Sequence, residues 1–167
     1  AFFLASDGEH EAKITANGWV ELKMKDVESM EIEKDFTVLD TGSPHYIQWE
    51  KHDRKINVFE EGRKIRYSAR FSEKGINVNF VEVHLSHISI STYERGVEAE
   101  TLSCGTGVTA AALAASDDEL KYYETEVVTK GGNLKVKFTK TGKTNFKNIW
   151  LCGPAQFVFS GTLNLSK

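Results

Sequence analysis

The sequence contains little cysteine and little proline, with two residues of each among 167. The two thiols, Cys104 and Cys152, build no disulfide framework, and no C-x-x-C spacing of the kind that holds zinc is present. This cysteine usage fits a reducing compartment. Pro44 and Pro154 form no Pro-rich linker, and no internal repeat or low-complexity tract is visible. The sequence therefore indicates no domain boundary within the chain.

Basic residues are not in excess, and no long apolar run occurs. The 21 Lys and Arg residues against 24 Asp and Glu residues give a net charge of -3, unlike the basic surface typical of nucleic-acid binding. No stretch approaches the roughly 20 apolar residues that a membrane helix needs. The opening residues AFFLASDGEHEAK lack the basic flank and the full apolar segment of a signal peptide. We expect a cytoplasmic protein with no nucleic-acid or membrane partner.

Alternating apolar and polar residues make strands the dominant predicted element, and Asn17-Gly18 is a strong hairpin signal between the first two. Two helices are expected, one over residues 56–71 and one over the Ala-rich residues 106–115. Strands therefore dominate the predicted structure. The expected strands cover residues 11–16, 19–25, 36–42, 45–50, 76–84, 87–94, 122–130, 133–140, 147–153 and 155–165.

A cysteine stands at an expected helix start in the stretch YERGVEAETLSCGTGVTAAALAA, residues 93–115. The first amides of a helix lack backbone partners and carry the positive end of its dipole, so they would face the Cys104 sulfur or a bound anion. A thiol in such a place can act as a proton donor and acceptor near neutral pH. The alternative is a small buried cysteine that packs at the helix start. Glycines on both sides of Thr106 favour a ligand, because they allow its close approach to the backbone.

Two polar turns at strand ends are further candidates for ligand contacts. Glu94 and Arg95 offer one anion and one planar cation for the zwitterionic end of an amino acid, and a solvated charged turn is the alternative. The loop DTGSPHY contains His45, for which a turn with a hydrogen-bonded histidine is the alternative. The other histidines show no spacing with acids typical of a metal site or a catalytic triad, so no metal site is predicted and we expect surface or structural roles for His10, His52, His84 and His87.

Four motifs follow one another along the chain: DTGSPHY, GINVNFVEV, YERGVEAETLSCGTGVTAAALAA and GPAQFVFSG. Together they resemble the second half of diaminopimelate epimerases, in the same order and at plausible spacing. The stretch from ERG to CGTG is the most specific part, whereas GPA alone would be weak. The resemblance extends over nearly the whole chain, from about Thr15 to Gly161.

The resemblance implies an α/β (α+β) fold of two pseudo-symmetric halves, each a strongly curved, mostly antiparallel sheet wrapped around a central helix, with the active site between them. Members of the family interconvert LL- and meso-2,6-diaminopimelate, a step of lysine and peptidoglycan-precursor biosynthesis, without a cofactor or a metal. Two cysteines on opposite faces of the α-carbon exchange its proton, one removing it and the other returning one. Amides at a helix N-terminus would stabilise the substrate carboxylate as carbanion character develops.

Residue by residue, the resemblance makes Cys104 one of the two acid/base residues, with the amides of Gly105 and Thr106 on the reacting carboxylate. Ser43 stands where many members have Asn, so a shorter hydroxyl would act there, through a water if necessary. The remaining substrate-binding residues implied by the resemblance are His45, which would line the site, and Asn77, Glu94 and Arg95, which would hold the distal amino-acid end.

The other catalytic cysteine of the family, in a Cys-Gly-Asn-Gly setting, has no match here. Cys152 lies on an expected strand before a different motif and is interpreted as a buried structural thiol. The opening AFFLAS is interpreted as the end of the first half's central helix. We therefore expect residues 1–12 to be a remnant of the N-terminal domain, residues 13–153 to be the C-terminal domain, and residues 154–167 to be a closing strand that returns to the N-terminal domain.

The expected partners are the small-molecule substrate, the missing N-terminal half and, by family resemblance, a second copy in a homodimer. Two alternatives to a diaminopimelate epimerase stay open. One is a racemase or epimerase of another amino acid, which Arg95 would distinguish because a one-headed substrate does not need it. The other is a non-catalytic half that binds an amino acid, which the thiol of Cys104 disfavours because binding needs no reactive group.

Overall fold

The computed structural model describes residues 1–5, 8–52 and 55–163. In this part of the chain twelve strands are hydrogen-bonded in the order β1-β2-β3-β12-β11-β10-β8-β7-β6-β5-β4, and β9 pairs with β8. The strands are β1 Phe2–Ala5, β2 Gly8–Ile14, β3 Trp19–Lys23, β4 Met30–Ile32, β5 Phe36–Asp40, β6 Pro44–Glu50, β7 Asn77–Val83, β8 Ile88–Glu94, β9 Ala99–Thr101, β10 Tyr122–Thr129, β11 Gly132–Gly142 and β12 Asn145–Pro154; the helices are α1 Val58–Arg66 and α2 Gly105–Ala114.

The sheet is mostly antiparallel, and within the described residues its two parallel pairs are β6 with β7 and β8 with β10. Parallel neighbours need a crossover connection, and α1 lies in the crossover between β6 and β7. Their register places His45 opposite Asn77 at one end and Glu50 opposite Glu82 at the other. Polar side chains therefore lie at both ends of this pair of strands.

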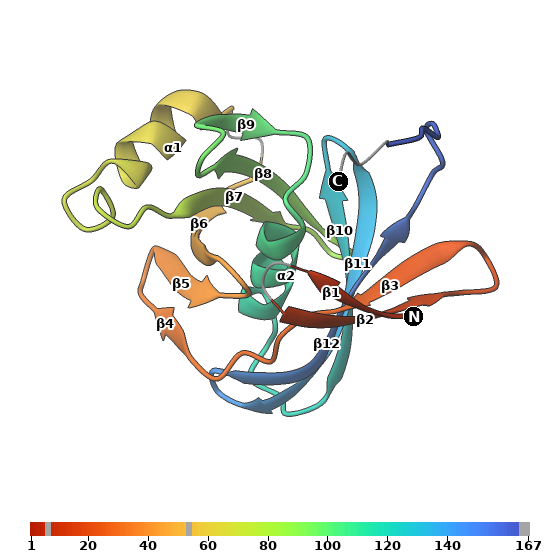
Figure 1. Cartoon of the computed structure of the whole chain (residues 1–167). Coiled ribbons are helices and arrows are strands. Elements are labelled where there is room, and N and C mark those ends of the chain that lie inside the picture. Colours follow the sequence, from red (N-terminus) through yellow and green to blue (C-terminus); the bar gives the residue numbers. More distant parts are fainter. Residues whose placement is uncertain (6–7, 53–54, 164–167) are drawn as a thin grey trace.

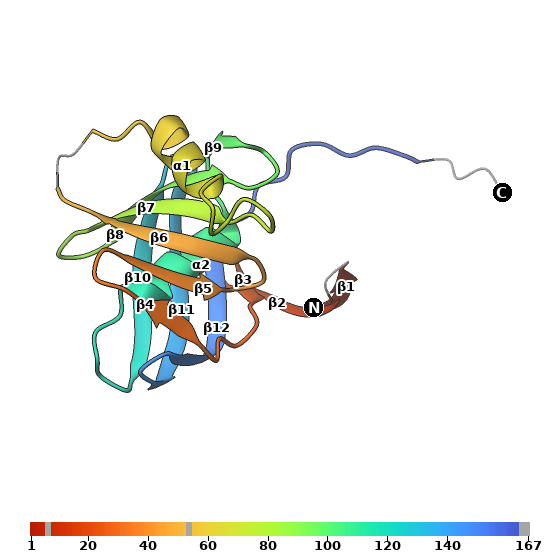
Figure 2. The same ribbon diagram turned by 90° about the vertical axis from the view of Figure 1, so that its left-hand side faces the viewer.

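Helix α2 lies inside the curved sheet. In Figure 1 it has β5–β8 on one side and β10–β12 on the other, and in Figure 2 strands β5–β7 run across β10–β12 with α2 between them. Its residues from Gly107 to Leu113 are all buried. A helix that is apolar on every side is stable only when it is covered on every side, and alanines let the strands approach it closely. Its neighbours in the main core include Ile47, Val127 and Phe138.

Helix α1 covers the other face of β7 and β8, where a second core contains Val78, Phe80 and Tyr93. Asn57 caps its N-terminus by accepting a hydrogen bond from the Glu60 amide. A Cβ atom at Gly62 would lie 2.4 Å from the Cβ of Tyr93, so the helix needs glycine there to reach the sheet. Neither helix in the described part of the chain is long and apolar enough to cross a membrane.

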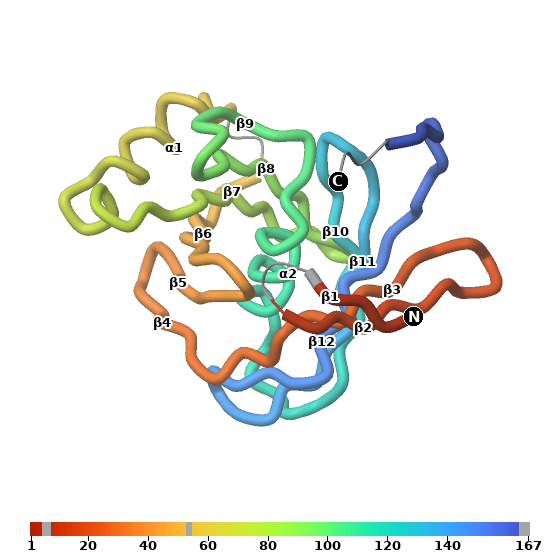
Figure 3. Tube along the Cα trace, in the orientation of Figure 1, coloured from red at the N-terminus to blue at the C-terminus, as the bar shows by residue number. Residues whose placement is uncertain are grey.

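Most predicted elements are confirmed. The helix expected over residues 106–115 is α2, and the strands expected between residues 11 and 153 are found as β2, β3, β5–β8 and β10–β12. The Asn17-Gly18 signal also holds, since Ile14 pairs with Val20 across the turn and Gly18 has a φ of +80°. The trace in Figure 3 shows this β2–β3 hairpin projecting from the body of the protein.

The two ends of the chain differ from the predictions. The opening stretch, interpreted as the end of a helix, instead contains the strand β1, in which Phe2 pairs with Glu11 of β2. Aromatic residues suit strands, and the edge of β2 supplies the backbone partners. The strand expected over residues 155–165 is absent from 155–163, while 164 and 165 lie outside the described residues. Figure 2 shows this segment leading away from the sheet, where it has no strand to pair with.

Three smaller differences concern local structure. The helix expected over residues 56–71 ends at Arg66, because the Ser68 hydroxyl donates to the Ile65 carbonyl and a series of turns follows. The short strands β4 and β9 were not predicted. Three residues are too few to show an alternating pattern, so only pairing with β5 and β8 reveals them.

Candidate active site

Cys104 is the N-cap residue of α2, with extended backbone angles and no side-chain capping hydrogen bond. The first helical hydrogen bond runs from the Val108 amide to the Cys104 carbonyl at 2.8 Å. The amides of the three residues between them therefore precede the hydrogen-bonded part of the helix. No acidic residue stands in the first turn to offset the positive end of the helix. The Cys104 side chain is buried, 8% exposed, beside amides that can bind an anion.

Thr106 is held in place by the loop after β5. The Thr41 hydroxyl donates to the Thr106 carbonyl at 2.8 Å, which fixes the start of the helix against this loop. The Thr106 hydroxyl lies 2.9 Å from Nε2 of His45 and 3.0 Å from the Ser43 hydroxyl. It also lies 3.5 Å from the Cys104 sulfur. One hydroxyl thus connects the expected loop residues to the expected catalytic thiol.

His45 is fully buried and is held by Asn79. The Asn79 carbonyl oxygen accepts a hydrogen bond from Thr92, so its amide nitrogen is directed to Nδ1 of His45 and to the Tyr46 carbonyl. Nδ1 is therefore an acceptor, and the ring hydrogen sits on Nε2, where it is donated to Thr106 or Ser43. Burial lowers the pKa of His45 to about 3, which keeps the ring neutral.

Asn77 joins the same cluster, and both ends of its side-chain amide are hydrogen-bonded within the protein. Its amide nitrogen donates to the Ser43 hydroxyl and to the Pro44 carbonyl, each at 3.2 Å, and its oxygen accepts from the Arg95 amide at 2.9 Å. In this structure Asn77 therefore orients Ser43 and the turn at Arg95. The direct substrate contact predicted for it stays a prediction.

Glu94 and Arg95 lie at the end of β8, connected to the cluster through Asn77. The exposed Arg95 guanidinium donates to the Lys74 carbonyl at 3.0 Å. Among the described residues the half-buried Glu94 carboxylate has no hydrogen-bond or ion-pair partner. Gly75 sits beneath the arginine, since a Cβ atom there would lie 2.6 Å from Cδ of Arg95. The structure thus brings all eight sequence-predicted site residues to one region: Cys104, Gly105, Thr106, Ser43, His45, Asn77, Glu94 and Arg95.

Three residues that organise the site were missed by the sequence reasoning: Thr41, Asn79 and Thr92. A signal for Asn79 was present, because residues two apart on a strand face the same side, and two asparagines in the apolar stretch INVNF mark one polar face. Thr92 gave no such signal, since threonine is common in any strand, and neither did Thr41, which lies in the loop after β5. Their buried hydroxyls become informative only once their partners are known.

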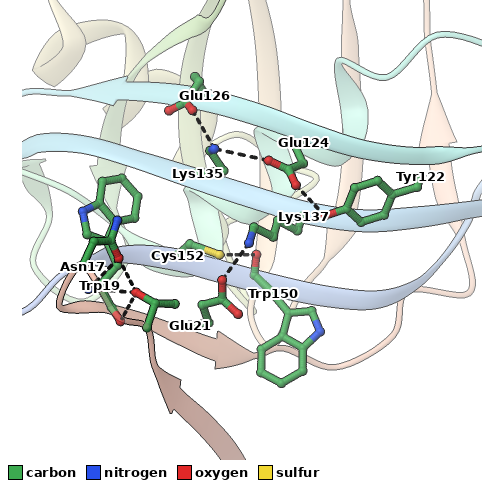
Figure 4. Close-up of polar contacts among 11 residues, drawn as sticks. Asn17, Trp19, Glu21, Tyr122, Glu124, Glu126, Lys135, Lys137, Trp150 and Cys152 are labelled. Carbon is green, nitrogen blue, oxygen red and sulfur yellow. Dashed lines mark hydrogen bonds and ion pairs between the residues drawn. The ribbon is translucent and has the colours of Figure 1, made fainter.

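Cys152 lies on the other face of the sheet from Cys104. Its neighbour Leu151 faces α2, where its methyl group would be 2.9 Å from a Cβ atom at Gly105, and side chains alternate along a strand. Burial raises the pKa of Cys152 to about 11. Figure 4 shows its sulfur on the outer face, near the ion pair of Lys137 and Glu21 at 2.7 Å. The interpretation of Cys152 as a buried thiol is confirmed.

The spacing of residues in the sequence linked none of the other histidines to an acid, but the fold brings two of them, His52 and His84, next to Glu82. His52 Nδ1 lies 3.3 Å from one oxygen of Glu82, and His84 Nε2 lies 3.5 Å from the other. These three residues offer ligand atoms that all lie within 4.8 Å of one another. The parallel pairing of β6 and β7 creates this group, which the sequence reasoning could not detect.

Comparisons with known proteins point to one family. The family model described as Diaminopimelate epimerase matches residues 37–158. The diaminopimelate epimerase of Flavobacterium psychrophilum is 44% identical over 163 residues, which cover 96% of this chain and 63% of the relative. That of Aquifex aeolicus is 40% identical over 129 residues, which cover 75% of this chain and 45% of the relative. The chain thus spans about half to two thirds of the length of these relatives.

Solved structures of similar fold are more distant in sequence. The Bacillus anthracis phenazine biosynthesis protein of the PhzF family superimposes with a TM-score of 0.65 at 14% identity, covering 92% of this chain and 64% of that one. A hydroxyproline epimerase from Agrobacterium vitis gives a TM-score of 0.60 at 14% identity, covering 92% and 56%. These similarities show the fold, a mixed and mostly antiparallel sheet with two helices, as the sequence predicted.

Proposed function

The chain belongs to the diaminopimelate epimerase family, and we propose that it acts on 2,6-diaminopimelate as the part of an epimerase that carries one of two acid/base thiols. The observation that supports this most is the position of Cys104, a buried thiol at the uncompensated positive end of α2. The adjacent Thr106 is tied to His45 and Ser43, so the start of the helix is rigid. Rigid placement of a base and of anion-binding amides is what proton abstraction beside a carboxylate requires.

In the proposed step the Cys104 thiolate takes the α-hydrogen of the substrate as a proton. The C–H bond breaks, an S–H bond forms, and the electron pair stays on the substrate, delocalised into its carboxylate. The amides of Gly105 and Thr106 would hold that carboxylate and favour the added negative charge. A second acid on the opposite face would return a proton, and in the reverse direction Cys104 would be that acid.

The second acid/base group would come from outside this sheet, because Cys152 faces away from α2. The division into residues 1–12, 13–153 and 154–167, with the last segment returning to an N-terminal domain, belongs to this proposal. So does the use of Glu94 and Arg95 for the distal amino-acid end of the substrate. Their opposite charges match the ammonium and carboxylate groups that distinguish diaminopimelate from a one-headed amino acid.

The deciding experiment is deuterium incorporation at the α-carbon of LL-diaminopimelate in heavy water under reducing conditions. The full 167-residue chain would be measured alone and mixed with the part of the Flavobacterium psychrophilum relative that it does not match. We expect exchange that disappears in Cys104→Ser and persists in the matched control Cys152→Ser. Appearance of the meso form would require the mixture, since inversion needs two faces.

Other outcomes separate the alternatives. Binding of diaminopimelate without exchange in either sample would support an amino-acid-binding half in place of an epimerase. Deuterium incorporation into another amino acid but not into diaminopimelate, at a rate that Arg95→Leu does not change, would support a racemase or epimerase of that other amino acid. Equal exchange in Cys104→Ser and the unaltered chain would remove Cys104 from the mechanism.

A further inference from the structure

Two histidines and a glutamate meet at the carboxyl ends of β6 and β7. His52 follows the last residue of β6 by two positions, Glu82 lies near the end of β7, and His84 follows β7 directly. His45 and Asn77 occupy the opposite ends of the same two strands. His52 follows His45 by seven positions of nearly extended chain, a distance of roughly 20 Å, so this cluster is separate from the candidate active site.

Strand geometry directs the three side chains to one place. The parallel register places Glu82 opposite Glu50, and residues two apart on a strand share a face, which puts His84 on the face of Glu82 and His52 on that of Glu50. This is the face that α1 covers further along, where Phe80 belongs to the second core. The cluster therefore results from the register of the sheet and does not depend on a chance contact between surface loops.

The distances between the Glu82 oxygens and the two histidine nitrogens fit the ligand atoms of a small metal ion as well as they fit hydrogen bonds. Zinc is bound by imidazole nitrogens and carboxylate oxygens at about 2.0–2.2 Å in tetrahedral geometry, so two ligand atoms of one ion lie about 3.4 Å apart. The glutamate oxygens lie 3.3 Å from His52 Nδ1 and 3.5 Å from His84 Nε2. All three ligand atoms lie within 4.8 Å of one another, so a small shift of the exposed His52 would close the set.

Neighbouring groups restrain the His84 ring in a position that suits a ligand. Its ring stacks on that of His87 with centroids 4.4 Å apart. The Ser89 hydroxyl lies 2.9 Å from Nε2, the nitrogen that also faces Glu82, and a metal ion bound to this nitrogen would displace that hydrogen bond. The His84 side chain is 22% exposed and that of Glu82 is 27% exposed, whereas His52 is 71% exposed. Two of the three side chains are thus mostly covered, at the end of β7, and the third lies open to solvent, from which an ion would enter.

We propose that His52, Glu82 and His84 form a site for a divalent transition metal, with zinc as the best-matched ion. Two imidazoles and one carboxylate leave one tetrahedral position for water or a ligand group. A cavity of about 360 Å³ adjoins the site, because Glu82 and Ser89 both contribute to its lining. A small anion or carboxylate bound there could fill the fourth position. The proposal goes beyond the epimerase activity and does not depend on it.

The test is a calorimetric titration of the full chain with zinc, which measures the number of bound ions and their affinity. We expect one ion per chain, and at least a tenfold weaker affinity in Glu82→Gln and His84→Ala. Even the loss of outer partners of a ligand weakens metal binding 10–100-fold, so the loss of a ligand should cost no less. The matched control is His10→Ala, which removes a histidine from β2 at the other end of the sheet.

Thiolates also bind zinc, so each titration is repeated in a Cys104→Ser, Cys152→Ser background, where the site should persist. Glu82→Gln is nearly isosteric, so it serves if His84→Ala does not fold. As a second readout, zinc should shift the ring-nitrogen resonances of His52 and His84 and leave those of His10 unchanged. Equal zinc affinity in the unaltered chain and Glu82→Gln, or no shift of these resonances, would reduce the cluster to two ordinary histidine–carboxylate contacts and overturn the proposal.

Discussion

Nε2 of His45 and the hydroxyl of Thr106 lie 2.9 Å apart, and the Ser43 hydroxyl lies 3.0 Å from the same nitrogen. Asn79 donates to Nδ1 and thereby holds the hydrogen on Nε2. Because Nε2 carries a hydrogen, the Thr106 hydroxyl does not donate to the ring, and its own hydrogen is available to the Ser43 oxygen or to the Cys104 sulfur, 3.5 Å away. A buried neutral histidine is therefore connected to the thiol through one hydroxyl group.

Thr106→Val should slow the reaction of Cys104 with iodoacetamide at pH 7.5. The substitution keeps the shape of the side chain and removes the hydroxyl that can donate to the thiolate. Hydrogen bonds to charged groups contribute about 1.5–3 kcal/mol, so a roughly tenfold or greater decrease in the alkylation rate is expected. Thr106→Ser retains the hydroxyl and should react within about twofold of the unaltered chain. Equal rates for the valine and serine variants would show that the hydroxyl does not affect the thiol.

The buried His45 should make the protein less stable as the pH falls. Its pKa is about 3 in the folded protein against an ordinary value of 6.5, so between these values the unfolded chain binds a proton that the folded chain does not. The free energy of unfolding then falls by about 1.4 kcal/mol per pH unit below pH 6.5, or about 2 kcal/mol by pH 5. Above pH 6.5 this effect is absent.

Urea unfolding of the unaltered chain and of His45→Gln at pH 7 and pH 5 measures this effect. The variant will be less stable at both values, because it loses the hydrogen bonds of the ring. The informative quantity is the difference between the two pH values, which should be smaller in the variant by about 2 kcal/mol. The same loss between pH 7 and pH 5 in both proteins would mean that His45 is protonated in the folded state.

Much of the fold could be predicted because its signals are local. Alternation along β5–β8 and β10–β12, the Asn17-Gly18 turn and the Ala-rich stretch of α2 each identify an element without knowledge of its neighbours. The order of the strands could not be obtained this way. Pairing of β3 with β12 joins residues more than a hundred positions apart, and no local pattern encodes such a contact.

The residues of the candidate site could likewise be predicted where a short motif contains them, but not where they depend on contacts between distant segments. Cys104 and its flanking glycines are recognisable in one short motif, and so is the loop containing His45. Their connection through Thr106 and Asn79 depends on how α2 sits against β6 and β7, which the sequence does not display. The cluster of His52 and Glu82 was missed for the same reason, since thirty residues separate the two.

Gly107→Ala should destabilise the protein, although alanine is the better helix former. A Cβ atom at Gly107 would lie 2.5 Å from Oδ1 of Asn79 and 3.3 Å from Cε1 of His45. These side chains are buried and hydrogen-bonded, so we expect a net loss of about 1–3 kcal/mol. Gly105→Ala is the matched control, because its Cβ atom would meet only the flexible end of Leu151 at 2.9 Å.

Both variants add one methyl group to the first turn of α2, where alanine is favoured over glycine by about 1 kcal/mol. Chemical denaturation should therefore find Gly105→Ala clearly more stable than Gly107→Ala. The Gly107 variant should also lose part of the pH dependence described above, because displacement of Asn79 would expose His45. If the two variants are equally stable, close packing of α2 against Asn79 is not what requires a glycine at position 107.

Cys152 should resist alkylation in the folded protein, whatever the reactivity of Cys104. Burial raises its pKa to about 11, and the nearby Glu21 carboxylate adds to this while Lys137 opposes it. At pH 8 such a thiol is ionised in about one molecule in a thousand, against roughly one in four for an ordinary thiol. In the Cys104→Ser chain, alkylation should be at least about a hundredfold slower than that of free cysteine, and urea should remove the difference.

Glu21→Gln should accelerate the alkylation of Cys152, since it removes the anion and leaves Lys137 beside the sulfur. Rapid alkylation of the folded Cys104→Ser chain would contradict the assignment of Cys152 as a buried, unreactive thiol, and would require its outer face of the sheet to open readily to solvent.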